Sequence, residues 1–92
     1  MHGVLVTVNL DAAQFEAARK ALQEQVIPNV KKMPGIVRGF WTRGADGTQG
    51  VSLVVFDTKE HADSASQFVR STPPPPGVTH VSIEVREVIA DV

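Results

Sequence analysis

The stretch MPGIVRGFWTRGADGTQGVSLVVFDT, which runs from Met33 to Thr58, decides the fold that the sequence predicts. Two runs rich in β-forming residues, Ile36 to Arg43 and Val51 to Phe56, flank the turn residues Gly44 to Gly47. Short β-forming runs separated by a glycine-rich tetrapeptide are typical of an antiparallel hairpin. The stretch therefore predicts a β-hairpin, with one strand and one helix on either side of it.

Before the hairpin, the sequence predicts a strand and a long helix. Gly3 to Val8 is a run of β-branched and aliphatic residues, as expected of a strand. Asp11 has the pattern of a helix N-cap, because its carboxylate is able to accept from the amide of Gln14. The apolar residues that follow recur every three or four positions and form one helix face: Phe15, Ala18, Leu22, Val26, Val30 and Met33.

Pro28 interrupts this helical pattern and leaves two interpretations open. In the first, the helix is kinked or loosened near Pro28, where the ring removes a backbone donor, and runs on to about Lys32. In the second, the helix ends at Ile27 and residues 28–33 form a loop. The continuing apolar stripe favours the first interpretation, with Pro34-Gly35 as the stop signal.

After the hairpin, the sequence predicts a shorter helix and a stiff connector. Asp57 or Thr58 is the expected N-cap, and the helix is expected to end near Arg70. Its inner face carries four apolar residues, which are Ala62, Ala65, Phe68 and Val69. The four prolines from Pro73 to Pro76 cannot be helical, so they predict an extended surface loop.

The last predicted strand, Thr79 to Ile89, alternates between apolar and polar residues. Successive side chains of a strand point to opposite faces, so the alternation assigns a face to each residue. The apolar face is expected to carry Val81, Ile83, Val85 and Ile89. The polar face is expected to carry His80, Ser82, Glu84 and Arg86.

The order strand, helix, strand, strand, helix, strand predicts a fold of the α+β class. It is the order of the ferredoxin-like βαββαβ fold, a four-stranded antiparallel sheet with two helices on one face and the first and third strands in the middle. These two strands are apolar on both faces, although two helices cover only one face. Each uncovered apolar side chain forgoes roughly 1.5–3 kcal/mol. We therefore expect a second copy to cover the other face in a homodimer.

Composition and charge bound the class of protein. Ninety-two residues, of which 42% are hydrophobic and 21% charged, are expected to form one domain spanning residues 1–92. The absence of cysteine excludes a disulfide, a thiolate metal site and a cysteine nucleophile. A net charge of −1 argues against a nucleic-acid partner, and no segment has the length of a membrane span. We expect a cytoplasmic protein.

Several punctuating residues resemble those of a known superfamily. They are Pro34-Gly35-Ile36 after the first helix, Phe40-Trp41 in the second strand, and Leu53 to Phe56 followed by the Asp57-Thr58 cap. In these features the chain is similar to the dimeric α+β barrel superfamily, and within it to antibiotic-biosynthesis-monooxygenase-like domains. The resemblance implies a homodimer, joined through the sheet face, with a ligand pocket between helices and sheet. It also implies activities that include cofactor-independent oxidation of quinol-type aromatics and haem degradation.

The resemblance also carries expectations about single residues. Haem-degrading members need a histidine late in or after the second helix and a tryptophan within it, and residues 65–76 contain neither. Haem degradation is therefore disfavoured, and no cofactor is expected. Asn9 is the candidate for a strand-one asparagine of the related enzymes, although it lies directly against the cap of the first helix.

Trp41 is the most informative single residue of the sequence. In one interpretation its indole is a pocket wall that stacks on a flat aromatic ligand, and in the other it is a large edge-strand side chain that only packs. The sequence favours packing. The other candidates for contact with a ligand are large apolar residues, namely Phe15, Leu22, Phe40 and Phe68.

Three histidines are the only candidates for a base near neutral pH. They are His2, His61 and His80; His61 is expected to be solvated, and His80 opens the polar face of the last strand. His80 and Asn9 are thus the catalytic candidates. No serine or carboxylate stands at triad spacing, and three scattered histidines do not predict a metal site.

Arg38 and Arg43 lie on opposite faces of a regular strand, so they cannot form one anion clamp. We expect separate surface or interface salt links for the two. Two functions remain, a cofactor-independent monooxygenase acting on an aromatic or quinol-type molecule and a non-catalytic dimeric ligand-binding or assembly module. An apolar cavity that holds Trp41, Asn9 or His80 favours the enzyme, whereas a space filled by the large apolar candidates favours the module.

Overall fold

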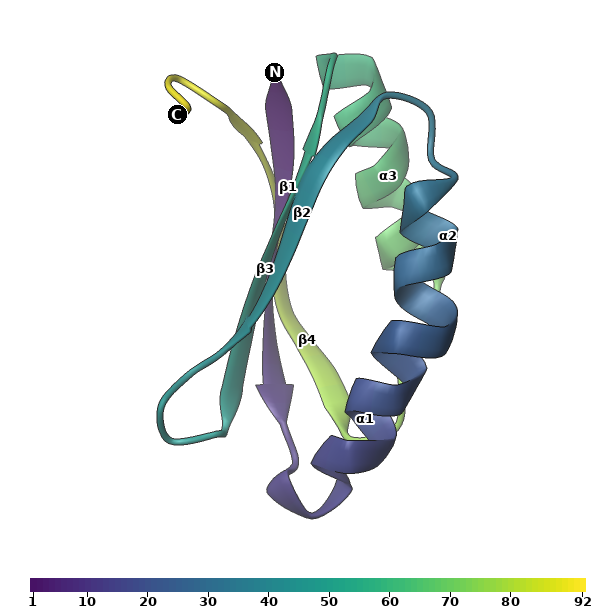
Figure 1. The fold of residues 1–92 in the computed structure, drawn as a ribbon, viewed down its shortest axis with the longest axis vertical. Helices are drawn as coiled ribbons and strands as arrows, with labels where there is room; N and C mark the ends of the chain where they lie inside the picture. The colour runs from purple at the N-terminus through teal and green to yellow at the C-terminus, as the bar shows by residue number, and fades with distance from the viewer.

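The computed structural model describes all 92 residues and contains one antiparallel sheet with two helical segments (Figure 1). The strands are β1 (His2–Leu10), β2 (Ile36–Arg43), β3 (Gln49–Phe56) and β4 (Val78–Glu87). Their order across the sheet is β2-β3-β1-β4, so β1 and β3 are central. This order confirms the ferredoxin-like βαββαβ fold.

The first helical segment is continuous but changes its hydrogen-bonding pattern. It consists of a 3-10 turn η1 (Ala12–Gln14), helix α1 (Phe15–Ala21), a π-helical turn η2 (Leu22–Val26) and helix α2 (Ile27–Lys31). The wide π turn ends two residues before Pro28, whose ring lacks the amide hydrogen that an α-helical ladder needs. The prediction of a helix loosened near Pro28 is confirmed, and the alternative that ends at Ile27 is wrong.

Both helical segments begin with side-chain caps. Asp11 accepts from the amide of Ala13 at 3.0 Å and from the side chain of Gln14 at 2.9 Å. The capped amide is thus one residue earlier than predicted, because the helix opens with a 3-10 turn. Thr58 caps helix α3 (Lys59–Ser71) by accepting from the amide of His61 at 3.2 Å. Of the two predicted caps for α3, the structure selects the hydroxyl of Thr58.

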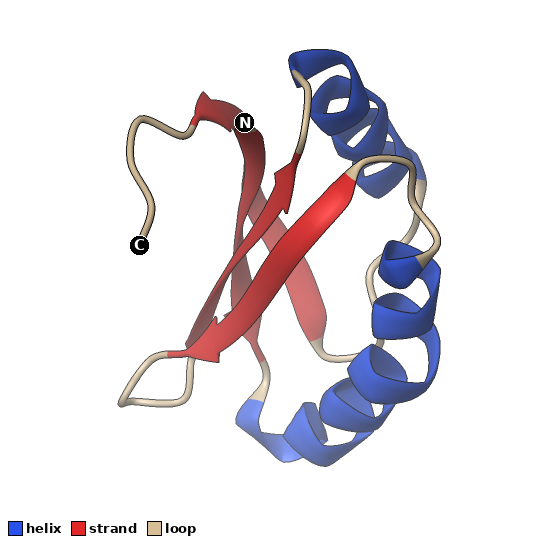
Figure 2. Cartoon of the chain, turned by 45° about the horizontal axis from the view of Figure 1, so that its top comes forward, coloured by secondary structure: helices blue, strands red, loops and turns tan.

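The two helical segments lie on the same side of the sheet but at different distances from it (Figure 2). Helix α3 packs against β1, β3 and β4, whereas the first segment makes few close contacts with any strand. The buried core accordingly lies under α3. It consists of Val4, Val6, Val54, Phe56, Ala62 and Ala65. Space therefore remains between the first helical segment and the sheet.

A bulge in β4 changes the prediction for the last strand. Thr7 pairs with Ser82 but its neighbour Val8 pairs with His80, so Val81 is an extra residue in β4. A one-residue bulge reverses the faces of all residues on one side of it. His80 therefore lies on the helix-covered face with Ile83, and its predicted place beside Ser82 is wrong.

The two ends of the last strand also differ from the prediction. The strand β4 begins at Val78 and ends at Glu87, so Ile89 lies beyond it and is exposed. The segment after β4 lies on the side of the sheet opposite to the helices (Figure 2). Ile89 is thus no part of the apolar face that the alternation predicted.

The other face of the sheet is uncovered within one chain. The alternation of β1 and β3 places Leu5, Leu53 and Val55 on this face, and each is only half-buried. Phe40 on the edge strand is 55% exposed. Only 11 of the 92 residues are buried, so a single chain has a small core and leaves much apolar surface in water. No helix is both long and apolar enough to cross a membrane.

Candidate functional site

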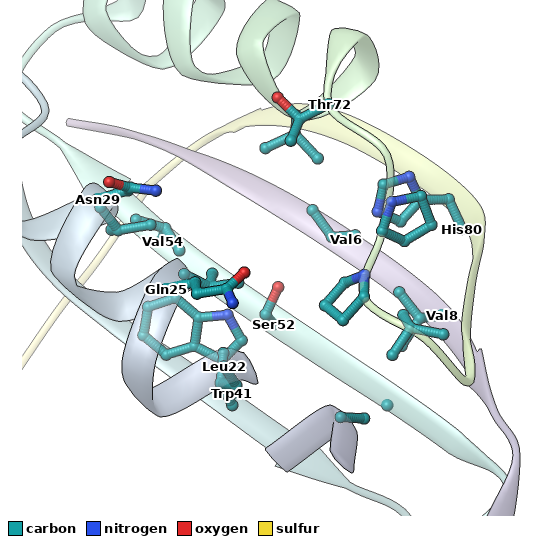
Figure 3. Close-up of a pocket in the computed structure, with 18 of the residues that line it drawn as sticks. Val6, Val8, Leu22, Gln25, Asn29, Trp41, Ser52, Val54, Thr72 and His80 are labelled. Carbon is teal, nitrogen blue, oxygen red and sulfur yellow. The ribbon is translucent and has the colours of Figure 1, made fainter. Parts of the chain in front are cut away.

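A cavity of about 630 Å³ occupies the space between the first helical segment and the sheet (Figure 3). Of the 32 residues that line it, 18 are hydrophobic. Aliphatic side chains of β1 and β3 form its floor, and Leu22, Val26 and Val30 form its roof. The exposed Gln25 and Asn29 also line it, so the cavity opens to solvent at the helix. This volume lies in the ordinary range for small-molecule sites.

Two rows of residues cross the floor from one edge strand to the other. Strand pairing defines a first row of Trp41, Ser52, Val6 and Ile83. A second row consists of Arg43, Gly50, Val8 and His80. It lies two residues along from the first row in β1, β2 and β3, and three residues along in β4 because of the bulge. The polar groups of the floor therefore lie mainly at its two edges, while aliphatic and small residues form the middle.

Trp41 lies at the β2 edge of the cavity. Its six-membered ring comes within 3.1 Å of the position that a Cβ on Gly39 would take, so the glycine leaves room for the indole. Figure 3 shows the indole near Leu22 and Gln25 of the helical roof. Trp41 is half-buried, and it forms part of the cavity wall.

His80 lies at the opposite edge, in β4. It is half-buried, and Figure 3 shows its imidazole beside Val8. Thr72 and the prolines from Pro73 to Pro76 complete the wall on this side. The polyproline connector, predicted as a surface loop, is therefore also a wall of the cavity. Its stiffness limits how far this wall can move.

Arg43 lies at the hairpin end of the cavity. Its guanidinium carbon is 3.6 Å from the centroid of the Phe15 ring, in the geometry of a cation–π contact. The same guanidinium lies close to Gly47, where a Cβ would come within 2.7 Å of Nη2. The chain has four ion pairs, and neither Arg38 nor Arg43 takes part in them. Within one chain, the salt links predicted for the two arginines are absent.

Most of the residues proposed from sequence line this cavity. Trp41, His80, Phe15, Leu22 and Phe68 all contribute to its wall.

Two of the sequence candidates do not line this cavity. Phe40 pairs with Leu53 on the opposite face, which removes it from the cavity. Asn9 is exposed and lines a separate surface hollow where β1 meets the first helix.

Sequence reasoning missed several polar residues of the wall. Gln25 and Asn29 lie four apart beside the apolar helix stripe, a spacing that could have revealed them. Ser52 alternates with Val54 on β3, which places it on the same face. Thr72 had no such signal, because it belongs to the turn after α3.

One histidine–carboxylate pair exists, and it lies outside the cavity. Nδ1 of His61 is 2.6 Å from Oδ1 of Asp57, and this hydrogen bond lowers the pKa of Asp57 below its ordinary value of 3.8. The amide of Asp57 donates to the carbonyl of Gly35 at 2.9 Å, which ties the start of α3 to the turn before β2. No group of three or more potential ligands is placed to hold a metal ion.

Solved structures with the same ferredoxin-like fold include a monooxygenase and a protein described as dimeric and ferredoxin-like, which confirms the fold that the resemblance implied. No protein-family model matches the sequence, and no curated protein matches it.

Three solved structures illustrate the likeness. HapK from Hahella chejuensis is 17% identical, with a TM-score of 0.70 over 100% of this chain and 96% of its own. The heme-degrader MhuD from Mycobacterium tuberculosis, with two hemes bound in its active site, is 16% identical, with a TM-score of 0.75 over 100% and 99%. A monooxygenase from the gene ActVA-Orf6 of Streptomyces coelicolor, in complex with Nanaomycin D, is 14% identical, with a TM-score of 0.64 over 99% and 89%.

Proposed function

We propose that this chain is a homodimeric, cofactor-independent monooxygenase that binds a flat aromatic molecule of the quinol type. One observation carries the proposal. The indole of Trp41 and the imidazole of His80 line the same apolar cavity from opposite edge strands. A largely apolar cavity with a few polar groups at its margins suits a ligand with an apolar body and polar ends.

The width of the sheet supports a ligand of two or three fused rings. Trp41 and His80 belong to edge strands that are three strand spacings apart, so the backbones of these two strands are separated by roughly 14 Å. Their side chains extend into this span and shorten it. Val6 and Val8, which lie between them, offer a smooth apolar floor for a ring system.

His80 is the candidate base for the reaction. Its imidazole would take a proton from a phenolic or benzylic position of the substrate. The resulting anion would give electrons to molecular oxygen and form a new carbon–oxygen bond. The peroxide anion takes the proton back from His80 and becomes a hydroperoxide. Its O–O bond and the remaining C–H bond at the same carbon then break with loss of water and leave a quinone carbonyl, so one oxygen atom enters the product and the other leaves as water. The apolar walls keep bulk water from the reactive anion.

A second copy of the chain is the proposed cover for the open sheet face. Phe40 and Val81 are both 55% exposed, and Leu53 and Val55 remain half-buried on the central strand. A face of this kind is unusual for a monomer and typical of an association surface. A similar structure is described as a dimeric ferredoxin-like protein, with a TM-score of 0.67 and 9% identity. An isologous pairing of this face buries it in both copies.

Oxygen uptake tests the proposed reaction. The wild type is supplied with a panel of two- and three-ring hydroquinones, and uptake is measured beside product formation. We expect uptake by the wild type and about 10²-fold or greater loss in His80→Ala, because general-base catalysis contributes on that scale. His2→Ala is the matched control, since His2 does not line the cavity and is expected to keep wild-type uptake.

Two outcomes contradict the reaction in different ways. If the panel quenches the fluorescence of Trp41 but no oxygen is consumed, the chain is a non-catalytic ligand-binding module. If the panel neither binds nor reacts, the cavity does not take flat aromatics.

Hemin is titrated in parallel because His80 is the one imidazole in the wall. A Soret shift that disappears in His80→Ala would replace the quinol with haem as the ligand.

A further inference from the structure

The cavity wall is cationic although the chain as a whole is slightly acidic. The sequence has 10 acidic and 9 basic residues, which gives a net charge of −1. None of the residues that line the cavity is aspartate or glutamate, whereas Arg19 and Arg43 both line it. A concave surface with charges of one sign attracts ligands of the opposite sign.

The two arginines differ in their availability to a ligand. Arg19 already has an ion pair with Glu16 at 3.6 Å. Arg43 has none: the carboxylate of Asp46, in the same hairpin turn, accepts from the amide of Thr48 at 3.0 Å and forms no ion pair with it. The face of the Arg43 guanidinium stacks on Phe15, so its N–H groups, which point outward in the guanidinium plane, are not consumed by the stacking.

Two neighbours restrict the side chain of Arg43 before any ligand binds. Phe15 and Gly47 both lie against the guanidinium. Its neighbour across the pair of strands is Gly50, where a Cβ would come within 3.0 Å of the Val8 side chain. Gly50 is buried, and the side chains of Val8 and Leu10 lie over it, so the floor beside Arg43 is apolar. Because Arg43 is exposed and has no ion pair, an acidic group can approach its side chain without displacing a protein partner.

We propose that Arg43 recognises an anionic oxygen group, a carboxylate or an ionised phenol, at the hairpin end of the bound ligand. This inference rests on the proposed aromatic ligand and narrows it to an aromatic acid. Arginine pairs with such groups through parallel N–H donors, which fixes orientation as well as charge. The acidic end at Arg43 would direct the rest of the ring system along the floor toward His80.

A matched pair of ligands tests the inference. Anthraquinone-2-carboxylate and anthraquinone-2-carboxamide have the same ring system and differ in charge. Trp41 is the only tryptophan and lines the cavity, so its fluorescence reports binding of both. We expect the wild type to bind the carboxylate about fivefold more tightly than the amide, the scale for a charged pair at a partly exposed site.

Three variants separate the role of Arg43 from other effects. Arg43→Gln is expected to lose the fivefold preference while it binds the amide as the wild type does. Arg43→Lys is expected to keep part of the preference, since the charge remains and the planar fork is lost. Arg38→Gln is the matched control, because Arg38 lies on the opposite face and pairs with Val55. It should keep the full preference.

The outcomes distinguish this inference from the proposed function. Binding of both ligands with equal affinity, or an unchanged preference in Arg43→Gln, overturns the role of Arg43 and leaves the aromatic cavity standing. Failure of both ligands to bind the wild type overturns the aromatic cavity itself, and the inference with it. A preference that declines from low to high salt in the wild type supports the charge pairing independently of any variant.

Discussion

The guanidinium of Arg43 lies 3.6 Å from the ring centroid of Phe15, and this contact joins edge strand β2 to the start of helix α1. The first helical segment has few other close contacts with the sheet, so the contact between Arg43 and Phe15 is one of the few that connect this segment to a strand. A double-mutant cycle with Arg43→Gln and Phe15→Leu is expected to give a coupling of about 0.5–1 kcal/mol in urea unfolding. Additive effects of the two substitutions would show that the stacking contributes nothing to stability.

The open sheet face predicts the mass of the particle in solution. Light scattering of the wild type at micromolar concentration should give twice the chain mass of 9.9 kDa. Phe40→Glu places a charge on this face and is expected to shift the mass toward that of one chain. Phe68→Glu is the matched control, since Phe68 is similarly exposed but lies on the cavity side. A wild type with the mass of one chain would contradict the dimer.

The pair of Asp57 and His61 predicts a stability that depends on pH in the acid range. The hydrogen bond with His61 lowers the pKa of Asp57 in the folded state, so its contribution is fully present above the unfolded value of 3.8. That contribution is lost as the pH falls through the lower folded pKa. Asp57→Asn should therefore show a smaller fall of the urea midpoint than the wild type below about pH 4.

Two comparisons make this pH experiment specific. The pKa of Asp46 is also lowered, chiefly by the hydrogen bond from the amide of Thr48, so Asp57→Asn is expected to retain part of the dependence. Asp91→Asn alters an exposed carboxylate beyond β4 and should behave as the wild type. If the urea midpoint of Asp57→Asn fell with pH as steeply as that of the wild type, the pair of Asp57 and His61 would make no contribution to the pH dependence.

Gly35 is a position where only glycine fits. Its φ is +78°, and a Cβ there would clash with the side chains of Asp57 and His61. Gly35→Ala is expected to lower the free energy of unfolding by about 1–3 kcal/mol from backbone strain, with a further loss from the displaced pair. Gly44→Ala is the control, because its Cβ would meet its nearest neighbour at 3.4 Å and its φ is not positive. Equal effects of the two substitutions would contradict this account.

Local patterns in the sequence predicted most of the fold correctly. The hairpin arm from Ile36 to Arg43, the cap at Asp11 and the passage of the helix through Pro28 all follow from features within a few residues. The apolar character of both central strands correctly placed them in the middle of the sheet. These features depend on chain periodicity, capping chemistry and turn residues, which a sequence displays directly.

The candidate site was predicted less completely, because it depends on pairing between distant segments. The residue type at position 80 made His80 a candidate, but its face depends on the bulge at Val81, and strand alternation alone gave the wrong face. Phe40 was assigned to a ligand although its pairing with Leu53 puts it on the other side of the sheet. The face of the sheet on which a strand side chain lies depends on the register of the strand. The register is set by pairing with the partner strand.

The sequence by itself determined the order of the elements, the central places of β1 and β3, and the apolar character of both sheet faces. The tertiary structure alone decided that the first helical segment stands away from the sheet, and that Trp41, His80 and Arg43 share one cavity. The physical reason is that a cavity exists where two layers fail to meet. That separation depends on side chains from every element at once, whereas each strand or helix is specified within its own few residues.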